Sequence, residues 1–364
     1  MEIFGCYFGT INVAIFTYDN WSMTTRKKIL LTGASGTIGY EVLKQLYDKS
    51  EAYEITAFDV KSPNSVKKLK QFSNKVEIVY GNISEVNDLI KVCSDKDVVI
   101  HLAAIIPPLA DEKPKLSYQV NTLGTKNLIR LLEQNSPNVF FLYSSSISVY
   151  GDRISNPFIT TNDIINPSYG DVYAETKIEA EESIKRSKLS WSIFRLSAIM
   201  GSHKISKLMF HLPLKTLMEI ATPKDAARAF VNAIENPKPL LNRIFNLGGG
   251  RNCRIRYDEF LSRSFSIYGL GKLDFPLKSF AEKNFHCGYC ADGDELENIL
   301  NFRKETVDDY FEREKKKTSP FIKFFTSIFK WAIKKHLLNQ SEPLIAIKKK
   351  DQKMINRFFN ISIG

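Results

Sequence analysis

Short apolar runs alternate with amphipathic stretches along most of this chain. A short apolar run bounded by turn residues predicts a buried β-strand, whereas apolar residues three or four positions apart predict a helix. The predicted strands are Ile29–Leu31, Glu54–Val60, Val76–Tyr80, Val98–Ala103, Val139–Tyr143, Trp191–Leu196 and Arg243–Leu247. The clearest predicted helices are Tyr40–Tyr47, Glu85–Cys93, 116–134 and Tyr257–Tyr268. Strands alternating with helices predict right-handed crossovers, and therefore an α/β fold with a doubly wound parallel sheet.

Three glycines, Gly33, Gly36 and Gly39, separate the first predicted strand from the first predicted helix. Glycine allows a sharp turn and a close approach of the backbone to a pyrophosphate, whose charge the N–H groups at a helix start stabilise. The spacing G-x-x-G-x-x-G is one residue longer at its front than the dinucleotide fingerprint G-x-G-x-x-G, and an ordinary strand-to-helix turn is the alternative. The turn predicts a phosphate-bearing ligand.

The second predicted strand ends in Asp59. A carboxylate about 20 residues past the glycine turn is where such folds bind the adenosine ribose, and its charge repels the extra phosphate of NADP. This position favours NAD. Lys61 leaves NADP as an alternative cofactor, because a basic side chain can accept that phosphate.

The fifth predicted strand leads directly into three serines, Ser144 to Ser146. Ligands of open α/β sheets bind beyond the carboxyl ends of the strands, so these hydroxyls are expected to face the ligand. Further along the chain, Tyr173 and Lys177 are four residues apart and would share one face of a helix. A nearby ammonium favours the phenolate and brings a phenol toward the range of a useful base. The spacing alone also fits an ordinary solvated helix.

Taken together, these motifs resemble the extended short-chain dehydrogenases/reductases, and within them the NAD-dependent epimerase/dehydratase family that includes UDP-galactose 4-epimerase. The resemblance covers roughly residues 27–312, and it rests on the order and spacing of the motifs. The motifs are Thr32-Gly33-x-x-Gly36-x-x-Gly39, Asp59, His101-Leu-Ala-Ala104, Asn121 in Val-Asn-Thr-Leu-Gly-Thr, Ser146 in Ser-Ser-Ser-x-x-Val-Tyr-Gly, and Tyr173-x-x-x-Lys177.

The resemblance implies a Rossmann-type domain that binds NAD and an enzyme that transfers a hydride. It implies that Tyr173 is the catalytic acid/base, that Lys177 lowers its pKa and holds the nicotinamide ribose, and that Ser146 hydrogen-bonds the reacting oxygen. Asn121 is implied as the supporting polar residue. The implied cofactor contacts are Gly33, Ser35, Gly36, Thr37, Ile38, Gly39, Asp59, Asn82, Ile83, Leu102, Ala103, Ala104, Tyr173 and Lys177.

Three departures from the family pattern affect the expected ligands. Asn82 stands where the family usually carries the aspartate that faces the adenine. Ala198 replaces the asparagine of similar nucleotide-sugar enzymes, which removes one contact to the sugar nucleotide. The segment between Gly201 and Thr222 is shorter than the family's usual substrate lobe. The last two weaken a nucleotide-sugar assignment without affecting the redox centre.

We expect four parts: an N-terminal extension (1–26), an NAD-binding Rossmann domain with the catalytic residues (27–200), a small substrate-binding portion interleaved with the last sheet strands (201–312), and a basic amphipathic tail (313–364). The tail holds 13 Lys/Arg and 3 Asp/Glu, whereas residues 1–312 hold 38 and 37, so nearly all of the net charge of +11 lies in the tail. This distribution argues against nucleic-acid binding by the main domain.

Within the tail, apolar residues at 321, 324, 325, 328 and 332 follow helical spacing, and Lys323, Lys330 and Lys334 fall on a different face. Such a helix suits the surface of an anionic membrane, with residues 319–350 as the expected contact. The alternative is that the apolar stripe packs on the enzyme domain or on a partner subunit, and a homodimer is one form of that alternative. The lysines interrupt the stretch too often for it to cross a bilayer.

The five cysteines are too few and too irregularly spaced for a disulfide scaffold, which fits a reducing cytoplasm. Cys287-Gly-Tyr-Cys290 has no second pair to complete a zinc site, so no metal is expected.

The leading hypothesis is an NAD-dependent oxidoreductase or epimerase that acts on a hydroxyl or keto carbon of a sugar or nucleotide-sugar. A second is a dehydrogenase of a lipid or sterol-like alcohol at the membrane surface. A third is an NAD-sensing binding protein without turnover, which has no physical need for the serine, tyrosine and lysine together. The sequence alone leaves the substrate and the net reaction open.

Overall fold

The computed structural model describes residues 26–201, 205–283 and 287–360. Within them, seven parallel strands form one sheet in the order β10-β7-β5-β4-β1-β2-β3. Their bounds are β1 Lys27–Thr32, β2 Tyr53–Asp59, β3 Val76–Tyr80, β4 Val98–His101, β5 Phe140–Ser146, β7 Ser190–Leu196 and β10 Arg243–Leu247. The predicted doubly wound parallel sheet is therefore confirmed. Almost all of the predicted extension at residues 1–26 lies outside the described residues.

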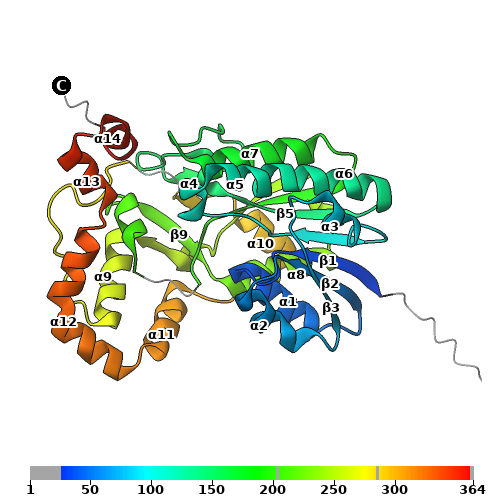
Figure 1. The fold of residues 1–364 in the computed structure, drawn as a ribbon, viewed down its shortest axis with the longest axis horizontal. Coiled ribbons are helices and arrows are strands. Elements are labelled where there is room, and N and C mark those ends of the chain that lie inside the picture. The colour runs from blue at the N-terminus through cyan, green and yellow to red at the C-terminus, as the bar shows by residue number, and fades with distance from the viewer. Residues whose placement is uncertain (1–25, 202–204, 284–286, 361–364) are drawn as a thin grey trace, which may run out of the picture.

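Helices cover both faces of this sheet (Figure 1). One face packs α1 (Thr37–Tyr47), α2 (Pro63–Leu69) and α8 (Pro223–Glu235), and the buried aliphatic and aromatic side chains between them form one core. The other face packs α3 (Val86–Ile90), α6 (Thr125–Asn135) and α7 (Val172–Lys185) over a second core. Because the strands are buried on both sides, they read as near-continuous apolar runs in the sequence.

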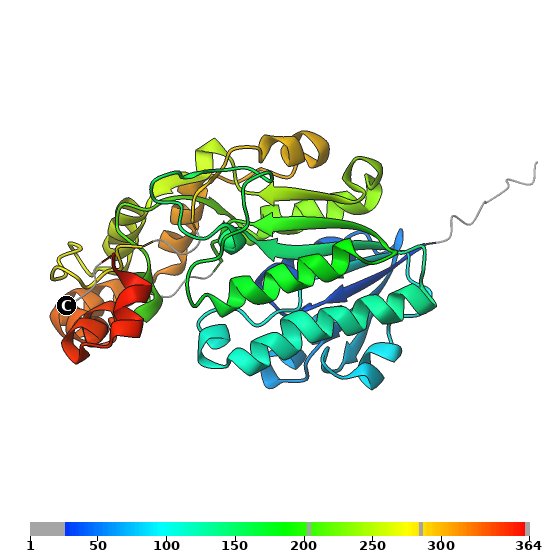
Figure 2. The ribbon, with the colours of Figure 1, turned by 90° about the horizontal axis from the view of Figure 1, so that it is seen from above.

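A second lobe lies beyond the carboxyl ends of the strands (Figure 2). Its small sheet has the order β11-β9-β8, and β6 pairs with β12. These strands are β6 Phe158–Ile159, β8 Ala198–Ile199, β9 Leu217–Ala221, β11 Arg254–Arg256 and β12 Tyr289–Cys290. The lobe's core joins α9 (Tyr257–Tyr268), α11 (Val307–Lys317) and the end of α12 (Pro320–Leu338). The remaining helices are α4 Leu109–Glu112, α5 Pro114–Ser117, α10 Asp294–Leu300, α13 Glu342–Lys349 and α14 Gln352–Phe358.

Two element boundaries differ from the prediction in ways that matter for the site. The fifth strand runs to Ser146 instead of ending at Tyr143, because the serines at 144–146 pair in register with residues 194–196 of β7. The long helix predicted over 116–134 is divided: Tyr118–Gly124 is π-helical and leads into α6. π-Helical segments inside helices are rare and are frequent at functional sites.

Candidate active site

The structure brings Ser146, Tyr173 and Lys177 together where β5 ends against α7. The Ser146 hydroxyl lies close enough to Tyr173 to favour the ionised form of its phenol. The Ser146 oxygen also accepts a hydrogen bond from the Ser148 backbone N–H at 3.1 Å, which fixes its position at the strand end. Asp171 caps α7 by accepting the Ala174 N–H at 3.0 Å, so the helix begins just before Tyr173. The three predicted residues thus form one contiguous polar group.

Lys177 is buried, and its ammonium donates a hydrogen bond to the Ser144 carbonyl oxygen at 2.8 Å. The same nitrogen lies 4.7 Å from the centroid of the Tyr143 ring and 5.7 Å from that of Tyr173. Burial lowers the pKa of Lys177 to about 7, and Glu181, one helical turn further on, opposes that shift. Lys177 is therefore able to change charge near neutral pH.

The pKa of Tyr173 is raised above its ordinary value, mainly by burial and further by the charge of Asp171, while the Ser146 hydroxyl acts in the opposite direction. Tyr173 is consequently protonated at neutral pH. The lowering of this pKa by Lys177, which the resemblance implies, stays a prediction.

Asn121 lies in the π-helical segment, and its amide is held by four hydrogen bonds. Its nitrogen donates to the Ile105 carbonyl at 2.9 Å, to Ser117 Oγ at 3.1 Å and to Thr176 Oγ1 at 3.0 Å, and its oxygen accepts the Ile105 N–H at 2.7 Å. Asn121 therefore links the chain after β4 to the helix that carries Tyr173 and Lys177. This arrangement fits the supporting role that the resemblance implied.

The glycine turn is closely packed. Gly33 has a φ of +72°, and a Cβ there would lie 2.7 Å from the Ala103 backbone nitrogen. At Gly39 a Cβ would lie 2.0 Å from the Gly33 carbonyl oxygen. Gly36 caps α1 without a side-chain hydrogen bond, and Thr37 and Ile38 begin the helix. The free N–H groups of this first turn are the ones that can bind a phosphate.

The predicted residues of the neighbouring strand ends lie beside this turn. The Leu102–Ala103 backbone is in contact range of Gly33, and Ala104 follows it. Asp59 ends β2, and its carboxylate accepts the Ser35 N–H at 2.6 Å and the Val60 N–H at 2.7 Å. The structure therefore places Asp59 directly against the glycine turn.

Asn82 and Ile83 follow the end of β3. Asn82 is exposed, and its side-chain oxygen accepts the Ser84 N–H at 3.0 Å. Ile83 is buried, and its side chain fills the space beside Gly124, where a Cβ would lie 2.9 Å from Ile83 Cγ2. Of this pair, only Asn82 carries a polar side chain that a ligand could reach.

Several residues around the site carried no spacing signal in the sequence. Lys68 of α2 donates to the Ser35 carbonyl oxygen at 2.9 Å, next to Asp59. Behind Lys177, Glu181 and Arg195 form a buried ion pair at 2.6 Å, and Arg195 also donates to Tyr150 Oη at 2.7 Å. His101, in contrast, belongs to one of the motifs of the resemblance; it is buried between Thr32 and Thr125, and burial lowers its pKa to about 3, so it is neutral.

The C-x-x-C pair does not form one site. Cys287 and Cys290 are both buried, and they belong to different apolar clusters. Burial raises the pKa of the Cys287 thiol to about 12, which makes it a poor ligand and nucleophile. No group of three His, Cys, Asp or Glu that could hold a metal is found among the described residues.

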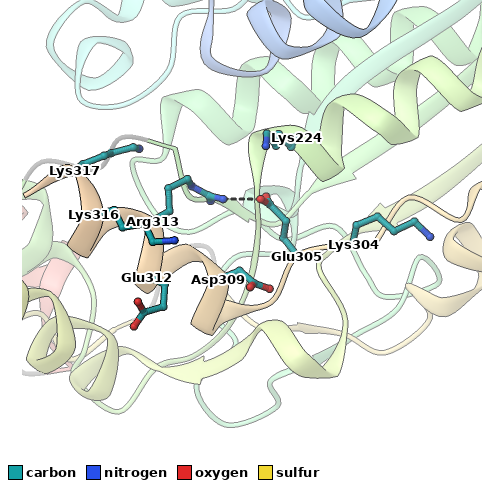
Figure 3. Close-up of a pocket in the computed structure, with 8 residues that line it drawn as sticks. All are labelled: Lys224, Lys304, Glu305, Asp309, Glu312, Arg313, Lys316 and Lys317. Atoms are coloured by element: carbon teal, nitrogen blue, oxygen red, sulfur yellow. Dashed lines mark hydrogen bonds and ion pairs between the residues drawn. The ribbon is translucent and has the colours of Figure 1, made fainter.

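A cavity of about 500 Å³ lies apart from this site, between α11 and the start of α8 (Figure 3). Arg313 is paired there with Glu305 at 2.6 Å. The wall of the cavity consists of Lys224, Lys304, Glu305, Asp309, Glu312, Arg313, Lys316 and Lys317. The cavity is thus an ion-paired junction that contains none of the predicted site residues.

Comparison with known proteins finds similarity to this arrangement. Residues 30–191, which hold the glycine turn, Ser146, Tyr173 and Lys177, match the model of the 3-beta hydroxysteroid dehydrogenase/isomerase family. UDP-glucuronic acid 4-epimerase from Bacillus cereus, solved with UDP-glucuronic acid and NAD, superimposes with a TM-score of 0.66 at 21% identity over 82% of this chain and 99% of that one.

Other proteins similar to this chain are named for different reactions. The dTDP-glucose 4,6-dehydratase of Bacillus anthracis, solved with NAD, gives a TM-score of 0.65 at 18% identity over 80% of this chain and 96% of that one. D-erythronate dehydrogenase of Haemophilus influenzae is 24% identical over 47% of this chain and 55% of that protein. The 3 beta-hydroxysteroid dehydrogenase type 7 of Mus musculus is 27% identical over 37% of each. The chain therefore spans about half the length, or less, of these curated relatives.

Proposed function

We propose that this chain is an NAD-dependent enzyme that transfers a hydride to or from a carbon bearing a hydroxyl or keto oxygen. The observation that carries this proposal is the placement of Ser146 at the end of β5 beside Tyr173 of α7, with Lys177 one turn further along that helix and its ammonium 5.7 Å from the Tyr173 ring centroid. Proton transfer to or from the oxygen is what such a reaction asks of the protein. The phenol, the hydroxyl and the ammonium at this strand end would supply it.

The glycine turn and Asp59 fit NAD as the cofactor. The absence of room for a Cβ at Gly33 and Gly39 keeps the backbone of the turn tight, and the N–H groups at the start of α1 are available for a pyrophosphate. Asp59 would hold the adenosine ribose, and Lys177 with Tyr173 would hold the nicotinamide end. When bound, NAD supplies the carbon that accepts or gives the hydride. Solved structures of similar fold that contain NAD support this choice.

The protonation states define what the side chains do. Because the pKa of Tyr173 is raised, its hydroxyl is an acid at neutral pH and gives its proton to a carbonyl oxygen that is being reduced. Ser146 donates to the same oxygen and thereby orients it. In the opposite direction, Tyr173 would take the proton of the substrate hydroxyl in its phenolate form. The Lys177 cation stabilises the phenolate whenever Tyr173 has given up its proton.

For the substrate we propose a sugar or nucleotide-sugar. Support comes from similar folds solved with UDP-glucuronic acid and from the sugar-acid dehydrogenase among the relatives. Tyr173 and Ser146 act on one oxygen of the substrate and do not recognise the rest of the substrate. The substrate class is therefore decided by the second lobe.

A lipid or sterol-like alcohol is the second candidate. The family model over residues 30–191 is that of 3-beta hydroxysteroid dehydrogenases, and Ala198 offers a methyl group where a nucleotide-sugar site needs an amide. A panel of nucleotide-sugars, free sugars, sugar acids and 3-hydroxysteroids, each assayed for NADH absorbance and for epimerised product, separates the two candidates.

The decisive variant is Tyr173→Phe, which keeps the ring and removes the proton carrier. We expect turnover of the panel's active substrate to fall about 100-fold or more, with NAD affinity retained. Tyr169→Phe is the matched control, because Tyr169 is an exposed tyrosine just before α7 and should leave turnover unchanged. Undiminished turnover in Tyr173→Phe would refute the assigned role. Tight NAD binding without turnover of any panel member would instead favour a non-catalytic NAD sensor.

Small molecules released from the denatured protein distinguish net oxidation from epimerisation. An epimerase returns the hydride to its substrate and has no need to exchange its cofactor. NAD retained through purification would therefore point to an epimerase cycle, whereas a cofactor lost on dialysis would point to a dehydrogenase.

A further inference from the structure

Helix α12 leaves most of its apolar surface uncovered. In its first twelve positions seven large apolar side chains are exposed, which we call the outer face of α12: Phe321, Ile322, Phe324, Phe325, Ile328, Phe329 and Trp331. Phe321 is 68% exposed and Trp331 72%. Single exposed apolar residues are ordinary, but a contiguous patch of this kind marks an interaction surface.

The end of α12 is anchored to the second lobe. Leu337 is buried in the lobe's core and Ile333 packs against it. Lys334 donates to the Lys272 carbonyl oxygen at 2.6 Å and pairs with Asp274. The helix therefore lies along the outer edge of the lobe, far from the main sheet (Figure 1). The predicted alternative, in which the stripe packs on its own enzyme domain, does not hold for the outer face.

Two lysines of α12 face α9, away from the outer face. The contact of the Lys323 backbone with Gly269 and the bonds of Lys334 show this orientation directly. Lys335 marks the far end of the outer face, 5.0 Å from the Trp331 ring. Counting from Lys315 to Ser341, the chain has seven lysines and no Asp or Glu. An apolar face bordered by this excess of positive charge is complementary to an anionic, apolar partner.

From this complementarity we infer that α12 docks the protein on the surface of an anionic lipid bilayer. The outer face enters the boundary between headgroups and acyl chains, while Lys335, at the end of that face, remains among the lipid phosphates. Trp331 has the amphipathic ring that prefers this boundary. The helix lies in the plane of the surface, since no helix of the described residues is long and apolar enough to cross a membrane.

The same charges disfavour a second copy of the chain as the occupant. Pairing two outer faces would bring the lysine-rich segment 315–341 of both copies together without one carboxylate from either segment. Like charges at short range oppose such a contact, whereas an anionic surface is attracted by each of them.

The groove between α9 and α12 supports the same occupant. It has a volume of about 730 Å³ and is bordered by Lys323 of α12. Lys272, Lys323, Ser262 and Ser266 contribute ammonium and hydroxyl groups to its wall, which also includes Asp258. These donors are the groups that a lipid phosphate would engage.

The test is flotation of the full chain, without cofactor or substrate, on phosphatidylcholine vesicles with and without phosphatidylglycerol. We expect binding to the anionic vesicles to exceed binding to neutral ones about tenfold or more. The variant Phe324→Ser/Phe325→Ser/Ile328→Ser should lose this binding, and Lys330→Glu/Lys335→Glu should lose the preference for anionic lipid. The matched controls change equally exposed residues elsewhere: Ile90→Ser for the apolar change, and Lys49→Glu/Lys188→Glu for the charge.

Because the changed residues are exposed, each variant should keep the wild-type circular dichroism, which verifies folding. Two results would overturn the proposal. One is binding that the triple serine variant retains. The other is a wild-type dimer without lipid that the same variant converts to a monomer, since the outer face would then join two copies. Neither readout involves turnover, so failure here leaves the proposed hydride transfer untouched.

Discussion

The ammonium of Lys177 donates a hydrogen bond to the carbonyl oxygen of Ser144 at 2.8 Å, which joins α7 to the carboxyl end of β5. The bond holds the helix bearing Tyr173 against the strand bearing Ser146. It also keeps a titratable amine in a buried place, where its charged form is penalised. The position of the site and its response to pH therefore both depend on this side chain.

The first prediction follows from the Lys177 pKa of about 7, against an ordinary value of 10.5. Between these values the unfolded chain binds more protons, so this residue makes folding more favourable as the pH rises. Replacing it in Lys177→Met removes that dependence. The stability of Lys177→Met relative to wild type should be highest near pH 7 and fall toward pH 10, measured by urea unfolding. A difference independent of pH would contradict the assignment, and Lys185→Met on the exposed side of α7 is the control.

The second prediction concerns Asp171, which is buried and has one carboxylate oxygen without a hydrogen-bond partner among the described residues. Burial raises its pKa to about 7 from 3.8. Between those values the folded state binds more protons, so the stabilising contribution of this residue is lost as the pH rises from about 4 to 7. Asn also caps helices well. Asp171→Asn should therefore gain stability relative to wild type over this range and stay level above it.

Asp163→Asn provides a control of opposite sign. Burial acts to raise the pKa of Asp163, but hydrogen bonds from Thr160 and the charge of the Arg153 guanidinium outweigh it and lower that pKa. The contribution of Asp163 to folding stability is present at neutral pH and is lost in acid. The stability of Asp163→Asn relative to wild type should then be lower at neutral pH than in acid. If both variants showed the same trend, the burial argument for Asp171 would fail.

The third prediction tests the choice of cofactor at Asp59. This carboxylate holds the Ser35 N–H at 2.6 Å and presents a negative charge beside the glycine turn. Asp59→Asn keeps an acceptor for that N–H and removes the charge that repels the NADP phosphate. The ratio of NAD to NADP affinity should fall about tenfold, measured by calorimetric titration of the purified protein. Lys61→Met should move the ratio the other way, and a ratio unchanged in Asp59→Asn would remove this residue from cofactor selection.

The parts of the site that the sequence predicts are those fixed by local spacing and by topology. Tyr173 and Lys177 share a helix face because they are four residues apart, and Ser146 meets them because parallel strands place their carboxyl ends at one edge. The glycine turn is recognisable because Gly33 and Gly39 leave no space for a Cβ, which restricts the residue type. Each of these constraints acts within one element or between neighbouring elements.

What the sequence does not predict depends on how distant surfaces meet. Glu181 and Arg195 pair only because α7 packs over β7, and Lys68 reaches Ser35 only because α2 lies beside the glycine turn. The altered pKa of Tyr173 has the same origin, since burial is a property of the packed molecule. A helical pattern likewise gives no sign of the π-helical segment around Asn121, because its apolar spacing is that of an ordinary helix.

The last prediction concerns the return of the C-terminal tail to the site. Arg357 of α14 pairs with Asp111 of α4 at 3.2 Å, and its charge lowers the pKa of the nearby Asp171 against the larger effect of burial. Both partners are mostly buried, so removing one leaves the other charge poorly solvated. A double-mutant cycle of Asp111→Asn and Arg357→Met should give a coupling of about 1 kcal/mol or more in urea unfolding. Lys353→Met, an exposed change on the same helix, should show no coupling to Asp111→Asn. Additive effects of the Arg357 and Asp111 changes would mean that α14 is held by its apolar residues alone.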